Sequence, residues 1–368
     1  MSRLARVCAV PLRPLRVAGR LVGAARHHGA PLPRVATHAF RQTRRGWRLG
    51  ELAMLGLLDP DRGPDAAPWA VRAAEIERLQ EALNPPEHVP VCEDKRRFAD
   101  FCARAGLPTP RRLAVLERDA EPAATVLEWS RILAEEGARR DIVVKPVDGH
   151  RGVGVRVLGR SHGALADHRG RPLDPVALAR RLAADPWPAY VVEERLRPHP
   201  ALRRLTGHDY LNTLRIVTLA EAGAPPRIAG CLWRVGTGGE PIDSFRAGAT
   251  GNLSVEIGED GRAGTPWALA RSGFGLEPVR VHPVTGEALE GYRVPDWDLA
   301  CATALRAAEA LRELPSVGWD VALTDRGPVL IEGNAWWAWL CDPRSAGEPP
   351  VVTAHRRAVA RAGAPAER

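Results

Sequence analysis

One segment of the chain, residues 142–155, combines a strand, a lysine, a glycine-rich loop and a second strand. An apolar β-branched run ends at Lys145, glycines follow at Gly149, Gly152 and Gly154, and the sequence resumes as Val-Arg-Val. Glycine lets backbone N–H groups approach a polyphosphate closely, because no Cβ stands in the way and a positive φ is accessible. The lysine ammonium is a compact charge that suits a phosphate oxygen. The segment therefore predicts a phosphate-binding loop between two strands.

The rarity of lysine supports this prediction. Lysine and arginine together number 52, but the only lysines are Lys95 and Lys145. An arginine-rich chain has thus kept one of its two lysines directly before the glycine loop; the alternative is that both survived by chance. The loop lacks Walker A spacing, because no Gly-Lys-Ser or Gly-Lys-Thr follows Gly152. We therefore expect a flexible lid over the phosphates instead of a rigid P-loop.

A second constellation of polar residues lies in residues 318–334, which read as a β-hairpin. A three-residue loop over 325–327, with its glycine in the left-handed conformation, would place Asp320 opposite Glu332 and Asn334 on the same face. Two opposed carboxylates repel, and a divalent cation reverses the sign of that interaction. Oxygen ligands favour Mg²⁺ or Mn²⁺ over zinc.

Two alternatives to the metal hairpin remain open. Either carboxylate could be an ordinary residue at the end of a hairpin, paired with an arginine. A register slip of one residue would also place the two acids on opposite faces of the sheet.

Hydrophobic periodicity predicts both helices and strands, and the sequence shows no internal repeat. At 368 residues it is long enough for two or three packed units, and its 45% hydrophobic and 26% charged content is typical of globular proteins. Helices are predicted over 50–58, 69–83, 96–105, 124–136, 176–184 and 299–314. Strands are predicted over 113–116, 142–144, 190–194, 214–219, 227–235, 253–257, 319–323 and 329–332.

The positive charge of the chain lies in its first part. The formal net charge is +8, but residues 1–50 hold eleven arginines and no acid, so the other 318 residues carry a net charge of −3. Leu12, Leu15 and Val22 could give this arginine-rich segment an apolar face, and such segments can lie on an anionic membrane or on nucleic acid. A solvated leader is the alternative. Because no nucleic-acid-binding motif accompanies it, no specific nucleic-acid partner is expected.

The cysteines and the hydropathy pattern bear on the compartment. The six cysteines show no CxxC spacing, which disfavours a zinc ribbon and a disulfide framework. No apolar run approaches the roughly 18 residues that span a bilayer, and no signal-peptide core follows the first residues. We therefore expect a cytoplasmic protein.

In their order along the chain, these features resemble ATP-grasp enzymes, and most of all the sugar-transfer-associated, alpha-L-glutamate-ligase-related group. The resemblance covers roughly residues 46–334 and rests on several motifs that occur in the same order. These are Leu83-Asn84-Pro85, Asp94-Lys95 before a helix followed by Gly-Leu-Pro-Thr-Pro, Lys145 before the glycine loop, Glu193-Glu194-Arg195-Leu196, Asn212 to Thr218, and Asp320 with Glu332-Gly333-Asn334.

The resemblance implies an α+β, ATP-grasp fold in which two α+β subdomains sandwich ATP. A basic leader over 1–45, partly helical or disordered, and a helical region over 46–90 would come first. The subdomain with the glycine loop would span 91–189, and the subdomain with the metal hairpin 190–343. The Pro/Ala/Arg-rich tail over 344–368 would be peripheral.

The resemblance also implies a role for each candidate residue. Lys95 and Lys145 would contact the nucleotide phosphates, and Gly149, Gly152 and Gly154 would close over them. Glu193, Glu194 and Leu196 would contact adenine, while Asp320, Glu332 and Asn334 would hold Mg²⁺ or Mn²⁺. Arg215, with Arg234 as a second candidate, would stabilise the transferred phosphoryl group or an acyl phosphate.

Three parts of the site stay open in the sequence. Residues 243–250 depart from the Asp-Asn-Phe and paired-glycine pattern of the group, so the acceptor site is not identified. Asp209 and His199 are the only candidates for a ribose contact. Trp336, Trp337 and Trp339 could wall a substrate pocket or pack in the core.

The implied activity is an ATP- and Mg-dependent carboxylate–amine ligase that works through an acyl phosphate. Its substrates would be small-molecule or glycan-linked carboxylates and amines, and cell-surface glycan or polysaccharide modification is the expected context. The first alternative is a kinase on the same scaffold. The second is a nucleotide-binding scaffold that the arginine-rich leader recruits to an anionic membrane.

Overall fold

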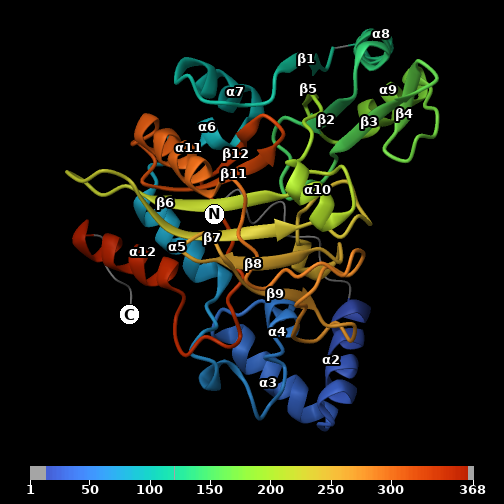
Figure 1. Cartoon of the computed structure of the whole chain (residues 1–368). Coiled ribbons are helices and arrows are strands. Elements are labelled where there is room, and N and C mark those ends of the chain that lie inside the picture. Colours follow the sequence, from blue (N-terminus) through green and yellow to red (C-terminus); the bar gives the residue numbers. More distant parts are fainter. Residues whose placement is uncertain (1–13, 120, 364–368) are drawn as a thin grey trace.

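The computed structural model describes residues 14–119 and 121–363, which form three packed parts (Figure 1). A cluster of N-terminal helices lies at the bottom of the view, a seven-stranded sheet lies in the middle, and a smaller unit with a five-stranded sheet lies at the upper right. Within the described ranges, no helix is long and apolar enough to cross a bilayer.

The N-terminal helices have an apolar core of their own, which includes Ala24, Val35 and Leu52. Over its described residues, the segment expected to be a partly helical or disordered leader is a pair of packed helices. Leu12 lies outside the described residues. The helices of this part are α2 (Pro14–His28), α3 (Leu32–Arg44), α4 (Leu49–Met54) and the 3₁₀ helix η1 (Pro64–Ala66). The next helix, α5 (Ala73–Leu83), packs against the larger sheet.

The smaller unit is an antiparallel sheet covered by two helices. Its strand order is β1-β5-β2-β3-β4. Trp129 of α8 and Tyr190 of β5 are fully buried between the helices and the sheet. Ile142 and Val144 face this core, and the strand alternation turns Lys145 to the opposite face. The elements are β1 (Arg112–Glu117), α8 (Pro122–Arg139), β2 (Ile142–Pro146), β3 (Arg156–Ser161), β4 (Ala164–Asp167), α9 (Pro175–Ala184) and β5 (Ala189–Glu194).

The larger sheet is also antiparallel, in the order β10-β9-β8-β7-β6-β11-β12. Its strands are β6 (Thr213–Leu219), β7 (Arg227–Val235), β8 (Leu253–Ile257), β9 (Ala263–Leu269), β10 (Leu276–Pro278), β11 (Ser316–Thr324) and β12 (Gly327–Asn334). The helical elements associated with this unit are α6 (Pro90–Glu93), α7 (Lys95–Arg104), α10 (Pro200–Thr206), the 3₁₀ helix η2 (Arg246–Gly248) and α11 (Trp297–Ala310). The two α+β units agree with the fold class that the sequence predicts.

The position of α7 differs from the predicted subdomain boundary. Phe98 and Phe101 of α7 pack against Trp319 of β11 and belong to the core of the larger sheet. The prediction had assigned the whole of residues 91–189 to the smaller unit. Helix α7 therefore packs with the larger unit, and its Lys95 end reaches toward the glycine loop.

The C-terminal segment is not peripheral over its described residues. Helix α12 (Pro350–Arg361) packs beside α5, and Val351, Val352 and His355 are fully buried. With Ala358 and Val359, these residues recur at the spacing of one helix face. The predicted peripheral tail was wrong because its Pro/Ala/Arg-rich composition concealed that periodicity.

His355 makes the stability of this packing dependent on pH. Its Nε2 lies 2.9 Å from the Ser316 Oγ and its Nδ1 lies 2.6 Å from the Val351 carbonyl oxygen. Burial lowers the pKa of His355 from 6.5 to about 4. Between these values the unfolded chain binds a proton that the folded chain does not, so acid favours unfolding. The stability that neutral His355 contributes is present above pH 6.5 and is lost as pH falls toward 4.

We expect the contribution of His355 to the free energy of unfolding to fall by about 1.4 kcal/mol per pH unit within this window. Urea unfolding at pH 7, 6 and 5 measures it, with the His355→Gln variant as the comparison. The free energy of unfolding of the variant should fall less steeply as the pH is lowered. Above pH 7, the difference in free energy of unfolding between the two proteins should stay constant. Equal slopes from pH 7 to 5 would contradict the assignment.

The β11–β12 hairpin has the predicted pairing but not the predicted loop. Asp320 pairs with Glu332, as expected. Thr324 pairs with Gly327, however, so the loop has two residues, and an irregularity beside Asp320 adds one residue to β12. A bulge of this kind shifts the register by one position. The shorter loop and the extra residue in β12 cancel each other, so Asp320 and Glu332 are still paired as predicted.

The side chain of Asn84 joins the N-terminal helices to the larger sheet. Its Nδ2 donates to the carbonyl oxygens of Ser316 (2.8 Å) and Ala335 (3.2 Å), and its Oδ1 accepts from the Ser316 N–H (3.0 Å). All three bonds are buried. They give the Leu83-Asn84-Pro85 motif a structural reason, since this amide ties together the two ends of the hairpin.

Candidate active site

A cavity of about 590 Å³ is lined by both sheets and by the N-terminal helices. Of the thirteen site residues predicted from the sequence, all but Gly154 line it. These are Lys95, Lys145, Gly149, Gly152, Glu193, Glu194, Leu196, Arg215, Arg234, Asp320, Glu332 and Asn334. The fold thus gathers residues that are up to 239 positions apart in sequence, which is the span from Lys95 to Asn334.

The two lysines enter the cavity from different units and are both buried. Lys145 on β2 pairs with Glu193 on the adjacent strand β5, with 2.6 Å between Nζ and Oε2. Lys95 donates from Nζ to the carbonyl oxygen of Gly149 at 2.7 Å. Burial lowers the pKa of Lys95, and the Glu332 carboxylate opposes that shift. Glu193, predicted to contact adenine, thus has the partner Lys145 within the protein.

The glycine loop is closely packed at its base. A Cβ on Gly154, which has a φ of +78°, would lie 2.7 Å from Pro146. A Cβ on Gly152, with a φ of +68°, would lie 3.0 Å from Ile242. Both the positive φ and these contacts select glycine. Gly154 shapes the base of the loop without lining the cavity, and Gly152 faces residues 241–248.

Residues 241–248 touch the glycine loop directly. Arg246 donates from Nε to the carbonyl oxygen of Arg151 at 2.9 Å. Arg246 and Ala247 both have positive φ values, 44° and 52°, which cost free energy for residues other than glycine. The segment whose sequence departs from the pattern of the resembled group therefore contacts the predicted phosphate lid.

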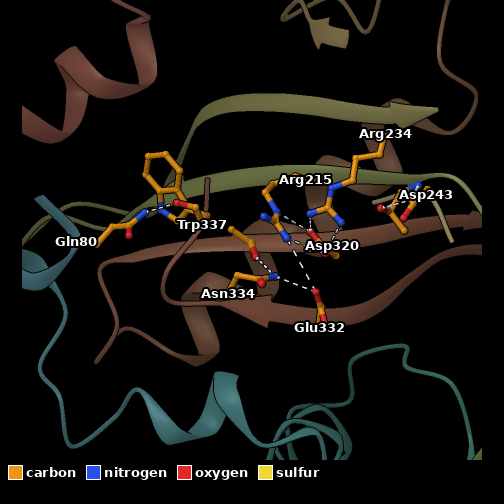
Figure 2. A network of polar contacts seen from close by, with 10 residues as sticks. Gln80, Arg215, Arg234, Asp243, Asp320, Glu332, Asn334 and Trp337 are labelled. Atoms are coloured by element: carbon orange, nitrogen blue, oxygen red, sulfur yellow. Dashed lines mark hydrogen bonds and ion pairs between the residues drawn. The ribbon is translucent and has the colours of Figure 1, made fainter. Parts of the chain in front are cut away.

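Arg215 and Arg234 converge on Asp320 from neighbouring strands (Figure 2). Arg215 donates to the two carboxylate oxygens at 2.8 and 2.9 Å, and Arg234 donates to them at 2.9 and 3.0 Å. Each oxygen thus accepts two hydrogen bonds. Burial alone would raise the pKa of Asp320, but the two guanidinium groups hold it well below its usual range. Asp320 is a buried anion that fixes the position of both arginines.

Glu332 and Asn334 lie on the other side of this cluster (Figure 2). Burial, followed by the charge of Asp320, raises the pKa of Glu332. The Asn334 Nδ2 donates to the Gly318 carbonyl oxygen at 3.2 Å and to the Glu332 Oε1 at 3.5 Å. The Glu332 side chain is 25% exposed, compared with 3% for Asp320. Glu332 is therefore the hairpin acid that remains open to the cavity.

The hairpin acids differ in how well they fit a divalent cation. A carboxylate has about four lone-pair sites, and at Asp320 four N–H groups occupy them. Glu332 and the side-chain oxygen of Asn334 keep acceptor capacity. In the part of the chain that the structure describes, no three His, Cys, Asp or Glu side chains form a metal-binding group. Mg²⁺ commonly takes one or two protein carboxylates together with phosphates and water, so Glu332 and Asn334 suit it as ligands. Asp320 could coordinate Mg²⁺ only if one arginine moved away and freed an acceptor site on its carboxylate.

Asp243 also lines the cavity, although no role was predicted for it. Its Oδ2 accepts from the N–H and the Oγ1 of Thr213, both at 2.6 Å. Burial raises the pKa of Asp243, and the nearby Arg234 opposes that shift. Asp243 is the first residue of the segment 243–250, which departs from the pattern of the resembled group. That departure was the only sequence signal that pointed to it.

Of the other residues left open by the sequence, Asp209 and all three tryptophans line the cavity, and His199 does not. His199 instead caps α10 through the Ala201 N–H. Trp336 is half-buried in the cavity wall. Trp337 is almost fully buried, donates to the Ser316 Oγ, and accepts at its carbonyl oxygen from the Gln80 side chain (Figure 2).

The chain is similar to known proteins over most of its length. The model of the sugar-transfer-associated ATP-grasp family matches residues 75–342. The comparison with curated proteins gives no match. Similar solved structures include D-alanyl-alanine synthetase A of Vibrio cholerae O1 biovar eltor str. N16961, with 14% identity, a TM-score of 0.40, and coverage of 71% of this chain and 63% of that one.

Two further structures are similar. The ATP-grasp ligase PsnB, solved with its minimal precursor, has 18% identity and a TM-score of 0.36, with coverage of 77% of this chain and 68% of that one. D-alanine–D-alanine ligase of Bacillus anthracis has 12% identity and a TM-score of 0.39, with coverage of 74% and 68%. The chain spans less than two thirds of the length of the Vibrio protein.

Proposed function

The chain belongs to the sugar-transfer-associated ATP-grasp family, and from that premise we propose that it is an ATP-dependent ligase that joins a carboxylate to an amine. The observation that carries the proposal is the convergence of Lys95, Lys145, Arg215 and Arg234 on one cavity. Four largely buried cations suit a reaction in which negative charge moves between phosphate and carboxylate oxygens.

The proposed reaction has two steps. A carboxylate oxygen attacks the γ-phosphorus of ATP, the bond from phosphorus to the β–γ bridging oxygen breaks, and ADP leaves. The amine nitrogen then attacks the acyl carbon, the bond from that carbon to the phosphate oxygen breaks, and phosphate leaves with the electron pair. The nitrogen gives up its proton to solvent. Neither step needs a protein nucleophile.

The protein contributes position and charge to both steps. Lys145, held by Glu193, and Lys95, held by the Gly149 carbonyl oxygen, present ammonium groups to the phosphates. Arg215 and Arg234 are already oriented by Asp320, so their donors need little reorganisation when charge develops on the transferred group. Glu332 and Asn334 would hold Mg²⁺ or Mn²⁺, which would neutralise phosphate charge when bound.

Trapping with hydroxylamine tests this function. An acyl phosphate reacts with hydroxylamine to give a stable hydroxamate, so a pool of carboxylic acids with Mg²⁺, ATP and hydroxylamine should yield hydroxamate and ADP in equal amounts. A kinase on the same scaffold would instead give a stable phosphorylated product and no hydroxamate. ATP binding without turnover on any acid would favour the nucleotide-binding scaffold.

The remaining parts of the proposal concern substrates and location. We propose small-molecule or glycan-linked carboxylates and amines as substrates, in keeping with the name of the family. A cytoplasmic location and contact of the arginine-rich leader with an anionic membrane stay predictions. Arg3, Arg6 and Arg13, which contribute to that charge, lie outside the described residues.

A further inference from the structure

The cavity continues past the two arginines to a second end, away from Lys95. We infer that this end binds the apolar body of the carboxylate substrate, so that the acid is aliphatic or similarly apolar instead of polyhydroxylated. This inference rests on the proposed ligase function and narrows its acid substrates to apolar ones, so that a glycan-linked group would enter only as the amine. It arises from four chain segments that meet there: α4, the residues before α5, residues 241–248 and the residues after β12.

Apolar side chains dominate the wall at this end. Four of them are half-buried, so part of each remains accessible; they are Met54, Val71, Phe245 and Leu340. Ligand pockets are typically lined by such side chains, with few polar groups that fix orientation. Covering this surface with an aliphatic chain gains roughly 25 cal/mol per Å² of apolar area removed from water.

The acids at this end are committed to protein partners. Glu51 accepts from the backbone N–H groups of Arg48 and Ala73, both at 2.8 Å. Glu77 accepts two hydrogen bonds from the Arg48 guanidinium, at 2.9 and 2.7 Å. A polyhydroxylated substrate needs hydrogen-bonding partners for each hydroxyl group that it buries, and without them its desolvation is costly. The surroundings therefore favour an apolar body.

The order of groups along the cavity sets the orientation of the substrate. Along the larger sheet, Lys95 lies by β12 at one edge, Arg215 and Arg234 lie on β6 and β7 in the middle, and α4 lies by β10 at the other edge. A carboxylate at the arginines would thus face the phosphates, with its body pointing toward α4. Met54 and Val71 precede the residues that the family model matches, 75–342. The inferred selectivity is in part a property of this chain's own N-terminal helices.

Three sodium salts test the inference in the hydroxamate assay: acetate, hexanoate and gluconate. Hexanoate and gluconate both have six carbons, but gluconate carries hydroxyl groups along its body. Because one methylene in an apolar pocket is worth about 10–200-fold in specificity, we expect kcat/KM for hexanoate to exceed that for acetate and for gluconate by at least about tenfold. Calorimetry with Mg²⁺ and a non-hydrolysable ATP analogue measures the binding of the same acids directly.

A polar substitution in the wall provides the matched variant. Met54→Gln preserves the length of the side chain, and acetate is too short to reach it. We expect the hexanoate-to-acetate ratio of kcat/KM to fall about fivefold or more. The control is Leu127→Gln on α8, where the apolar side chain is 73% exposed and far from the cavity wall, so that the ratio stays at its original value.

The outcomes separate this inference from the proposed function. Hydroxamate formation with gluconate equal to or better than with hexanoate would overturn the apolar site and leave the ligase standing. An unchanged ratio in Met54→Gln would also overturn it. If no acid yields hydroxamate, the ligase proposal fails, and calorimetry decides the inference alone: hexanoate must bind more tightly than gluconate and acetate.

Discussion

Lys145→Met lowers the turnover number about 10²- to 10³-fold, because the variant removes a fixed positive charge from the developing negative charge on phosphate oxygens. The structure adds a second consequence. Lys145 and Glu193 form a buried ion pair, with side chains 7% and 9% exposed. Removing one partner leaves an uncompensated buried charge, which costs about 3–5 kcal/mol of stability. The variant should therefore be both slow and less stable.

The double variant Lys145→Met with Glu193→Gln separates the two effects. It removes both charges of the pair, so most of the lost stability should return in urea unfolding while the turnover number stays low. ADP formation and unfolding are measured on the same preparations. A stably folded Lys145→Met protein with full ATP-dependent activity would refute the assignment of Lys145 to the phosphates.

Asp320→Asn is expected to lower the turnover number by a similar factor for a different reason. The amide keeps one acceptor oxygen but replaces the other with a donor, which faces the guanidinium N–H groups of Arg215 and Arg234. Both arginines then lose the anion that orients them. If Asp320 acts by positioning the arginines, the affinity for the divalent cation should change little.

Binding of Mn²⁺ in the presence of ADP, followed by electron paramagnetic resonance, distinguishes the two roles of Asp320. We expect Glu332→Gln to weaken Mn²⁺ binding and Asp320→Asn to leave it within about threefold. A ligand or a group that supports a ligand typically contributes 10- to 100-fold to metal affinity. A loss of that size in Asp320→Asn would show that Asp320 coordinates the metal and that an arginine leaves it on binding.

The sequence predicts most strands because their patterns are local, whereas the fold class followed from the resemblance to ATP-grasp enzymes. The run that ends at Lys145 and the strand 227–235 show the alternation and β-branched composition of strands, and the structure has both. Helix α12 shows where local composition misleads. Its apolar residues have helical spacing, but proline, alanine and arginine dominate the segment and obscure the pattern.

The site was predictable as a set of residues but not as a set of contacts. Family order identifies Asp320, Arg215 and Arg234, yet the arginines lie 105 and 86 residues away from Asp320 in the sequence. Whether the Asp320 carboxylate binds a metal ion or two guanidinium groups depends on which strands lie next to β11 in the sheet. That order is set by tertiary packing, which periodicity does not encode. For Asp320, the alternative of an arginine-paired carboxylate describes the contacts observed.

The side-chain amide of Asn84 couples the helices before it to the larger sheet, so the two parts are not independent modules. It bonds to the backbone on both sides of the β11–β12 hairpin, while Gln80, one helical turn earlier, bonds to Trp337. The helices that shape one end of the cavity and the hairpin that carries its acids therefore share a buried seam. Unfolding of the N-terminal unit would leave these backbone groups unsatisfied, so the two parts form one cooperative unit. A helical unit from another protein could replace it only by supplying equivalent amides.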